Sequence, residues 1–323
     1  MLVVSKSLLI TLSVLLLPTK RFGSVDGHKV TATLITNHNY PVEEHTVHTP
    51  DGYILTIYRI PTSFKSQQLN GTIEKKVVFL QHGILCASDD WIINGPETSL
   101  AYMFADAGFD VWLGNARGNT YSRQHKHIHP DTSDFWRFSW HEIGVYDLAA
   151  MLDYALAESK SSSLHFVAHS QGTTTFFVLM SSLPWYNEKT LLTDVCVTHP
   201  AGASTSQIIH YLQLYTSGDF RQYDHGREQN EILYQQAIPP SYNVRNIKTC
   251  VEMYYSENDY MSAVEDVEYL ASLLPCVELY RIPYSDWNHY DFLWSINVKE
   301  VINNRILDKI LVYDRDHGNS LSL

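Results

Sequence analysis

Apolar and polar positions alternate along this chain in two distinct ways. Apolar runs rich in β-branched and aromatic residues predict strands near residues 46–60, 76–81, 109–113, 164–168, 249–255 and 277–282. Longer runs with helical spacing predict helices near residues 97–107, 141–158, 171–183 and 297–312. Strands separated by helices are typical of a mostly parallel sheet that is covered on both faces. The sequence therefore predicts an α/β fold.

A sharp turn around a serine joins the predicted strand at 164–168 to the helix that follows. Such a strand-to-helix turn strains the backbone of the serine and exposes its hydroxyl at the top of a sheet, so the residues two positions away must be small. These residues are Ala168 and Gly172, where the usual pattern has glycine at both places. We predict that Ser170 is a nucleophile. The alternative is an ordinary serine in a turn after a buried strand.

Two further residues have the chemistry that a serine nucleophile requires. A serine hydroxyl needs an adjacent base, and that base is oriented by a carboxylate. Asp259 follows the strand at 249–255, and His289 follows the strand at 277–282. The chain order of serine, acid and histidine is the one found in hydrolases with this turn. We therefore predict Ser170, Asp259 and His289 as a catalytic triad.

The residues that could hold the negative charge of a reaction intermediate are two backbone amides. One donor is expected from Gln171, directly after the nucleophile. The other is expected from Ile84, because the buried strand at 76–81 runs into a loop in which Gly83 lets the backbone approach a substrate closely. A plain turn glycine at Gly83 is the alternative.

These motifs lie in a chain that resembles the acid lipase family, which includes the gastric and lysosomal acid lipases. The resemblance covers most of residues 35–313 and is carried by YPVEEHTVHTPDGYILTIYRIP, VVFLQHGIL, DWIINGPETSLAYMFADAGFDVWLGNARGNTYSRQH, FWRFSWHEIGVYDLAAMLDYAL, HPAGASTSQIIHYLQLYTSGDFRQYDHG, PPSYNV and NHYDFLW. It implies an α/β-hydrolase fold and a serine ester hydrolase that acts on triacylglycerols or sterol esters without a cofactor. It also implies the same triad and the same two amide donors.

One part of the family pattern is absent. In the acid lipases the nucleophile helix is followed by a core strand and then by a long helical cap with a movable lid. Here residues 181–189 lead almost directly to the apolar run at 191–198, which predicts an internal deletion and a shortened cap. A missing central strand would leave buried N–H and C=O groups unpaired in its neighbours. The run at 191–198 has the composition to replace that strand.

The predicted division of the chain follows from these boundaries. We expect a secretory signal peptide at residues 1–24 and a short tail at residues 314–323. Between them, the two parts of a hydrolase core at residues 25–185 and 246–313 are separated by a truncated cap at residues 186–245. The apolar run at 8–17 suits a signal and is too short to span a bilayer. We predict a secreted or lysosomal protein with no transmembrane segment, glycosylated at Asn70 in the sequon Asn-Gly-Thr.

Charge, cysteine and histidine content narrow the possible partners. The net charge is −12 and long Lys or Arg blocks are absent, which argues against nucleic-acid binding. The four cysteines are Cys86, Cys196, Cys250 and Cys276. They allow three pairings, among which the sequence does not choose. In a chain of this size the cysteines are incidental or form one bridge rather than a disulfide framework, and buried thiols are our default interpretation of Cys250 and Cys276. The histidines between 125 and 130 have no carboxylate or cysteine at ligand spacing, so we predict no metal site.

The leading functional hypothesis is a serine ester hydrolase whose partner is a neutral lipid ester at a lipid–water interface. Trp287 and Tyr290, on either side of the predicted base, are candidates for lining the acyl pocket. Two alternatives remain open. A chain without a lid could act as a carboxylesterase on soluble esters, or the protein could be a lipid carrier without catalytic activity.

Overall fold

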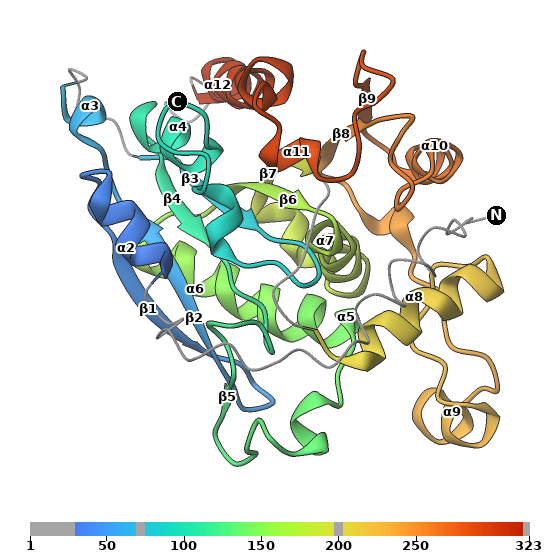
Figure 1. Ribbon diagram of the computed structural model, residues 1–323. Helices are drawn as coiled ribbons and strands as arrows, with labels where there is room; N and C mark the ends of the chain where they lie inside the picture. Colours follow the sequence, from blue (N-terminus) through green and yellow to red (C-terminus); the bar gives the residue numbers. More distant parts are fainter. Residues whose placement is uncertain (1–29, 69–74, 197–202, 319–323) are drawn as a thin grey trace.

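A computed structural model of the chain describes residues 30–68, 75–196 and 203–318 (Figure 1). Within these residues a mixed β-sheet lies between two layers of helices. The predicted signal peptide and the sequon at Asn70 lie outside the described residues.

The strands of the sheet follow the order β1-β2-β4-β3-β6-β7-β8-β9, and β5 pairs with β2. Their bounds are β1 Glu43–His48, β2 Tyr53–Ile60, β3 Val77–Gln81, β4 Asp110–Leu113, β5 Gln124–His125, β6 Leu164–His169, β7 Thr190–Cys196, β8 Cys250–Tyr255 and β9 Val277–Arg281. The strands from β4 to β9 along this order are parallel, and β1 and β2 are antiparallel to their neighbours. The predicted α/β architecture is confirmed.

The α-helices are α2 Val30–Asn37, α3 Phe64–Gln67, α4 Leu100–Asp106, α5 Trp140–Glu142, α6 Ala149–Ser159, α7 Gln171–Ser182, α8 Thr205–Ser217, α9 Arg227–Tyr234, α10 Val264–Leu273, α11 Asp291–Trp294 and α12 Asn304–Gly318. Two π-helical segments extend them, at Ile143–Leu148 before α6 and Lys299–Asn303 before α12. Residues 314–318, expected in the tail, belong to α12.

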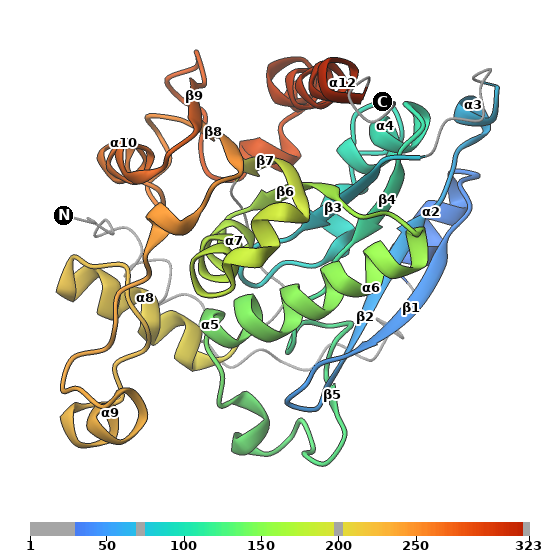
Figure 2. The ribbon, with the colours of Figure 1, turned by 180° about the vertical axis from the view of Figure 1, so that it is seen from behind.

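The two faces of the sheet are distinguished by alternate residues of its strands. Phe79 and Phe166 point into a core shared with α6, α7 and α10. Their sequence neighbours Val78 and Val167 point into a second core shared with α4 and α12. Figure 2 shows α6 and α7 lying across the first of these faces. Because both faces are covered, the central strands β3 and β6 are buried along their whole length.

The single strand predicted at 46–60 is wrong, because the segment forms the hairpin of β1 and β2. The turn contains Gly52 with φ of 102°, a left-handed conformation that favours glycine. The hairpin signal is the Asp51-Gly52 pair between two alternating runs.

Strand β7 occupies the position of the central strand that the internal deletion was expected to remove from the sheet. It pairs in parallel with β6 on one side and with β8 on the other. In the backbone register, Thr193 is the partner of Phe166 in β6 and of Val251 in β8. Over the described residues 190–196 this run therefore replaces the missing strand, and the backbone groups of β6 and β8 have partners there. Residues 190–196 belong to the sheet rather than to the expected cap at 186–245, and α8 and α9 follow them outside it (Figure 1).

The interpretation of Cys250 and Cys276 as buried thiols is wrong, because the two residues form a disulfide bond. Cys250 begins β8 and Cys276 directly precedes β9, and these strands are neighbours. The sequence placed both residues beside core strands but gave no register, and the register brings their Cα atoms within 4.6 Å of each other. Cys86 is buried and is not part of a disulfide bond.

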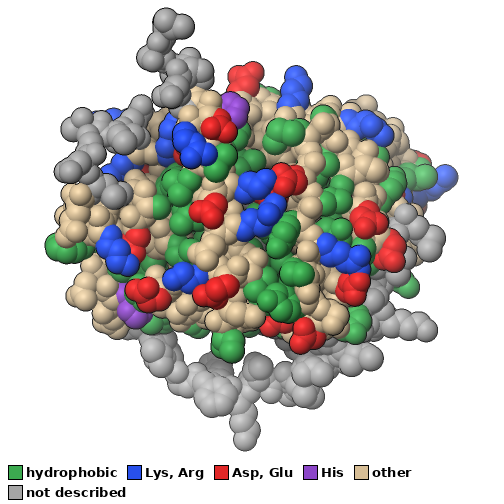
Figure 3. Space-filling view, turned by 90° about the horizontal axis from the view of Figure 1, so that it is seen from above, with side chains coloured by type: hydrophobic (Ala, Val, Ile, Leu, Met, Phe, Trp, Pro, Cys, Tyr) green, Lys and Arg blue, Asp and Glu red, His purple; other side chains and the backbone are tan. Residues whose placement is uncertain are grey.

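The outer surface carries charges of both signs. On the face seen from above in Figure 3, lysine and arginine side chains are interspersed with aspartate and glutamate. Ion pairs account for part of this mixing, for example those that Arg305 and Lys309 of α12 form with Glu278 of β9. Within the described part of the chain, no helix combines the length and apolar character needed to cross a membrane.

Candidate active site

The turn at Ser170 has the strained geometry that the sequence predicted. Ser170 lies between β6 and α7 with φ of 53° and ψ of −123°, a conformation that non-glycine residues rarely adopt. A Cβ atom on Gly172 would lie 2.6 Å from the Gln81 carbonyl oxygen and 2.8 Å from that of His82. The requirement for a small residue at 172 therefore comes from the close approach of α7 to the end of β3.

A hydrogen-bonded chain of three side chains extends from Ser170. The Ser170 hydroxyl lies 3.5 Å from Nε2 of His289, and His289 Nδ1 shares a 2.7 Å hydrogen bond with Asp259 Oδ1. His289 and Asp259 are each only 4% exposed, so little water competes for this bond. The fold thus brings together the three side chains predicted from the sequence. The longer serine–histidine distance is usual for such a site without substrate.

The loop of Asp259 is fixed by its own backbone. Asp259 Oδ1 accepts hydrogen bonds from the amides of Met261 and Ser262, at 2.9 and 3.0 Å. Together with the bond to His289, these contacts hold the carboxylate toward the imidazole. The orientation of the base therefore depends on the local turn after β8 as well as on the sheet.

The loop after β3, which contains Ile84, lies beside the serine turn because Gly172 packs against its first residues. Leu85 has φ of 60°, an unusual conformation for a bulky residue. Gln171 begins α7, so its amide is at the N-terminus of that helix. This contact brings the segments of the two predicted amide donors together at the carboxyl ends of β3 and β6.

His82 ties this loop to its neighbour and was not singled out by the sequence. Its Nδ1 donates to the Gly83 carbonyl oxygen at 2.7 Å, while Nε2 accepts from the Ala116 amide at 3.0 Å. The side chain of Asn119 lies 3.2 Å from the same Nε2. The signal that could have identified His82 is its position directly before Gly83 at the end of a buried strand.

The neighbouring loop is itself anchored by a buried arginine. The Arg117 guanidinium donates to Asp51 Oδ2 at 2.6 Å and to Asp147 Oδ1 at 2.8 Å, and its plane covers the ring of Tyr53. The buried charges of Arg117 and Asp147 satisfy one another, and the more exposed Asp51 gives the guanidinium a second carboxylate partner. Through Arg117, the loop that contacts His82 is bound to Asp51 in the turn of the β1–β2 hairpin and to Asp147 in the π-helical segment before α6.

The burial of His82 makes a contribution to the free energy of unfolding that depends on pH. Burial lowers the pKa of His82 to about 4, below its ordinary value of 6.5. Between pH 6.5 and 4 the unfolded chain binds this proton and the folded chain does not. The contribution of His82 to the free energy of unfolding therefore falls on acidification through this range, by about 3 kcal/mol. We expect the His82→Gln variant to lose about one proton from the pH dependence of unfolding in this range.

Urea unfolding at a series of pH values checks this prediction. The buried residue His210, whose pKa burial also lowers, contributes equally to both proteins because His82 is not among the groups that act on it. The relevant quantity is therefore the difference in slope between parent and variant. Equal slopes in both proteins would contradict the assignment.

Other predicted residues have different surroundings. Trp287 is 4% exposed and packs in the core with Phe292, which gives it a structural position. Tyr290 stacks on Trp294. Nε2 of His125 lies 3.0 Å from the Asp51 carbonyl oxygen, and Nδ1 accepts hydrogen bonds from the backbone amides of His127 and Ile128. No cluster of metal-ligating side chains is found in residues 30–68, 75–196 and 203–318.

A serine on a strained strand-to-helix turn, with a carboxylate and a histidine after later strands of a parallel sheet, defines the α/β-hydrolase class. Residues 76–184 match the α/β-hydrolase fold, and residues 31–95 match a partial α/β-hydrolase lipase region. An esterase from Pyrococcus furiosus has the same fold, with a TM-score of 0.55, 13% identity, and coverage of 92% of this chain and 96% of that one.

More similar relatives are lipases. Lipase 3 of Drosophila melanogaster is 35% identical over 87% of this chain and 92% of its own length. Human gastric triacylglycerol lipase is 32% identical over 89% of this chain and 92% of its own length. The protein therefore belongs to this lipase family of α/β-hydrolases. The alignment with Lipase 3 runs over 366 positions, more than the 323 residues of this chain, so the relative has residues that are absent here.

Proposed function

We propose that the protein is a serine ester hydrolase in which Ser170 is the nucleophile, His289 the general base and Asp259 the residue that orients it. The observation that carries this proposal is the hydrogen-bonded chain from Ser170 through His289 to Asp259 at the carboxyl edge of the sheet. A serine is activated in this way by a base that a third group holds in place. The chemistry needs no cofactor.

The reaction proceeds in two steps. The Ser170 oxygen attacks the ester carbonyl carbon while His289 Nε2 takes the hydroxyl proton, and the imidazolium then returns it to the leaving alcohol. Water attacks the resulting acyl-enzyme by the same route and releases the acid. The amides of Ile84 and Gln171 donate to the carbonyl oxygen as it becomes negative, and Asp259 stabilises the imidazolium.

We infer that the substrates are neutral lipid esters. Family membership and the printed name of the gastric triacylglycerol lipases support triacylglycerols, and sterol esters have the same reacting group. A secretory or lysosomal location and glycosylation at Asn70 remain part of this proposal. The short segment outside the sheet between β7 and β8 favours a second candidate, a carboxylesterase of soluble esters, because a short cap shields less of the site.

One comparison tests the reaction and separates the two candidates. The purified protein is treated with a fluorescent alkylphosphonate that labels activated serines, and its turnover is measured on tributyrin below and above the solubility limit. We expect labelling, and a rise in turnover when emulsion droplets form. Equal turnover on dispersed and emulsified substrate would favour the carboxylesterase. A folded protein that takes no label would contradict the proposed function.

A further inference from the structure

The loop after β3, which carries Ile84, has a strained backbone directly beside that residue. Leu85 has φ of 60°, a left-handed conformation that is costly for a bulky side chain. Such a conformation persists only where the surrounding structure holds the backbone on both sides of it. On the side of β3 the loop is held by His82 and by the close contact with Gly172. The position of the Ile84 amide therefore also depends on what holds the loop after Leu85.

After Leu85 the loop continues into the short 3₁₀ segment Ser88–Trp91, and Ser88 is completely buried. The Ser88 amide donates to Asn115 Oδ1 at 2.9 Å, and Asn115 Nδ2 donates to the Ser88 hydroxyl at 3.0 Å. These two bonds fix residue 88 to the loop that follows β4. A second set of contacts comes from α2, a helix that is distant in the sequence.

Thr31 of α2 connects Ser88 with the next residue of the loop, Asp89. Thr31 is completely buried, and its hydroxyl oxygen lies 2.8 Å from that of Ser88 and donates to Asp89 Oδ1. The Tyr121 hydroxyl donates to the same carboxylate oxygen at 2.7 Å and accepts from the Thr31 amide at 3.2 Å. Because a carboxylate only accepts, it fixes the direction in which both hydroxyls donate. These four residues form the α2 network, and within it Thr31 binds both loop positions.

We propose that Thr31 is a positioning residue for ester hydrolysis, because by binding Ser88 and Asp89 it holds the loop whose Ile84 amide meets the carbonyl oxygen as it becomes negative. The inference rests on the proposed function and adds to it a residue from a helix that contains no member of the triad. Preorganised donors stabilise an oxyanion because they need no reorientation during the reaction. Without the Thr31 hydroxyl, the backbone at Leu85 relaxes and the amide turns away from the oxyanion.

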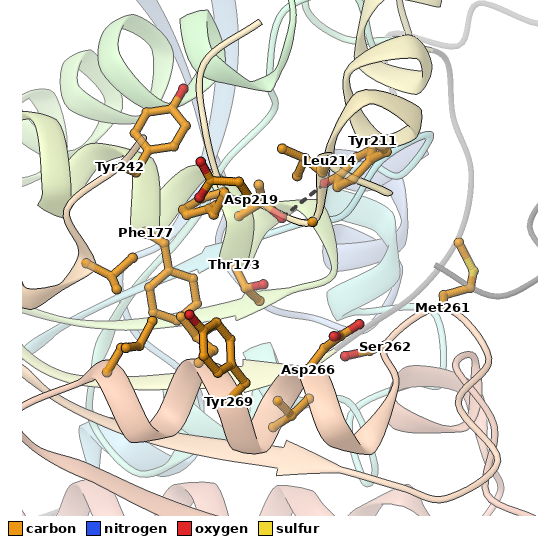
Figure 4. A pocket seen from close by; sticks show the side chains of 17 residues that line it. Thr173, Phe177, Tyr211, Leu214, Asp219, Tyr242, Met261, Ser262, Asp266 and Tyr269 are labelled. Atoms are coloured by element: carbon orange, nitrogen blue, oxygen red, sulfur yellow. Dashed lines mark hydrogen bonds between the residues drawn. The ribbon is translucent and has the colours of Figure 1, made fainter. Parts of the chain in front are cut away.

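The α2 network supports the active site from the side opposite to Asp259. In the sheet β3 lies on one side of β6 and β8 on the other, so the loops after β3 and β8 flank the turn at Ser170 (Figure 1). Met261 and Ser262, whose amides bind Asp259, line a cavity of about 260 Å³ together with side chains of α7 and α10 (Figure 4). None of the described residues of the α2 network lines this cavity. Substitutions at Thr31 therefore test the donor loop without touching the contacts that hold the acid of the triad.

Removal of the Thr31 hydroxyl tests this proposal. Thr31→Val keeps the shape of the side chain but cannot donate to Asp89. Loss of a whole oxyanion donor costs about 100- to 1,000-fold in kcat, and here Tyr121 and Asn115 still hold part of the loop. The kcat on p-nitrophenyl butyrate therefore falls about tenfold. KM stays within about twofold of the parent value, because the uncharged ester gains little from the donor.

A transition-state analogue gives a readout that a change in stability alone does not move. With a trifluoromethyl butyl ketone, the Ser170 oxygen adds to the carbonyl carbon and the hydroxyl proton passes to His289. The carbonyl π electrons become the negative charge on oxygen that the Ile84 and Gln171 amides receive. In Thr31→Val the inhibition constant rises by the same factor by which kcat/KM falls. A loss of kcat without this rise overturns the proposal.

Two matched variants separate the hydroxyl from packing and from the helix. Thr31→Ser keeps the hydroxyl and loses only a methyl group, so it retains the parent kcat. Thr36→Val makes the same substitution at an exposed position of α2, where the hydroxyl donates to the Ala32 carbonyl oxygen, and it also retains the parent kcat. A loss in either variant as large as that in Thr31→Val overturns the proposal. Melting temperatures show which variants are folded, and Tyr121→Phe, which removes the other donor to Asp89, provides the test if Thr31→Val does not fold.

Failure of this inference is distinguishable from failure of the proposed function. Phosphonate labelling and ester turnover by the parent, together with the parent kcat and inhibition constant in the folded test variant, overturn only the role of Thr31. A folded parent that takes no label overturns both.

Discussion

The Ser170→Ala variant is expected to lose ester hydrolysis by about a million-fold in kcat, which is the loss recorded when the nucleophile of another triad enzyme is removed. Without the hydroxyl, His289 has no nucleophile to deprotonate and no acyl-enzyme forms. The measurement is kcat on p-nitrophenyl butyrate, with phosphonate labelling in parallel. Retained hydrolysis in the alanine variant would contradict the role of Ser170.

The control for this variant is the fold. Ser170 has φ of 53°, and the Cβ atom of alanine meets the same steric strain in this conformation as that of serine. The substitution therefore does not change the backbone strain of the turn. We expect the melting temperature to remain close to that of the parent. A matched variant at Thr174, whose hydroxyl accepts from Tyr211 at 3.0 Å, removes a hydroxyl from the same helix outside the triad. Thr174→Ala is expected to retain labelling by phosphonates.

The Asp259→Asn variant is expected to lose about ten-thousand-fold in kcat, as in serine proteases with the same triad. An asparagine carbonyl oxygen can still accept from the amides of Met261 and Ser262, so the loop keeps its shape. The negative charge beside His289 is lost, however, and with it the stabilisation of the imidazolium in the transition state. Active-site titration followed by steady-state kinetics gives the value per folded molecule.

A loss of less than tenfold in Asp259→Asn would show that another carboxylate orients His289. Asp291 is a useful comparison because it follows the same histidine and accepts a hydrogen bond from the Asn288 amide at 2.7 Å. Asp291→Asn removes a charge close to the site without touching the bond between His289 and Asp259. It is expected to have a much smaller effect on kcat.

The fold and the candidate triad could be predicted from the sequence because both depend on local patterns. The buried runs that become β3 and β6 are short and continuously apolar, and the residues around Ser170 restrict the turn by size. The positions of Asp259 and His289 follow from the rule that parallel strands end at one edge of a sheet. Each inference needs only the neighbouring residues and a chain order.

The properties that could not be predicted depend on register and packing between distant segments. The disulfide of Cys250 requires the pairing of β8 with β9, and the role of His82 requires the loop at Ala116 to lie beside it. The burial of Trp287 depends in the same way on residues from many elements. Local sequence gives no measure of such distances.

The strand order also has a consequence for how the chain is made. From β6 onward the strands β7, β8 and β9 join the sheet in the order in which a ribosome produces them. Each new strand covers the open edge left by the one before, so the sheet can grow during synthesis without a long-lived bare edge. Asp259 follows β8 and His289 follows β9. The nucleophile is thus in place early, and the residues that would make it reactive arrive last.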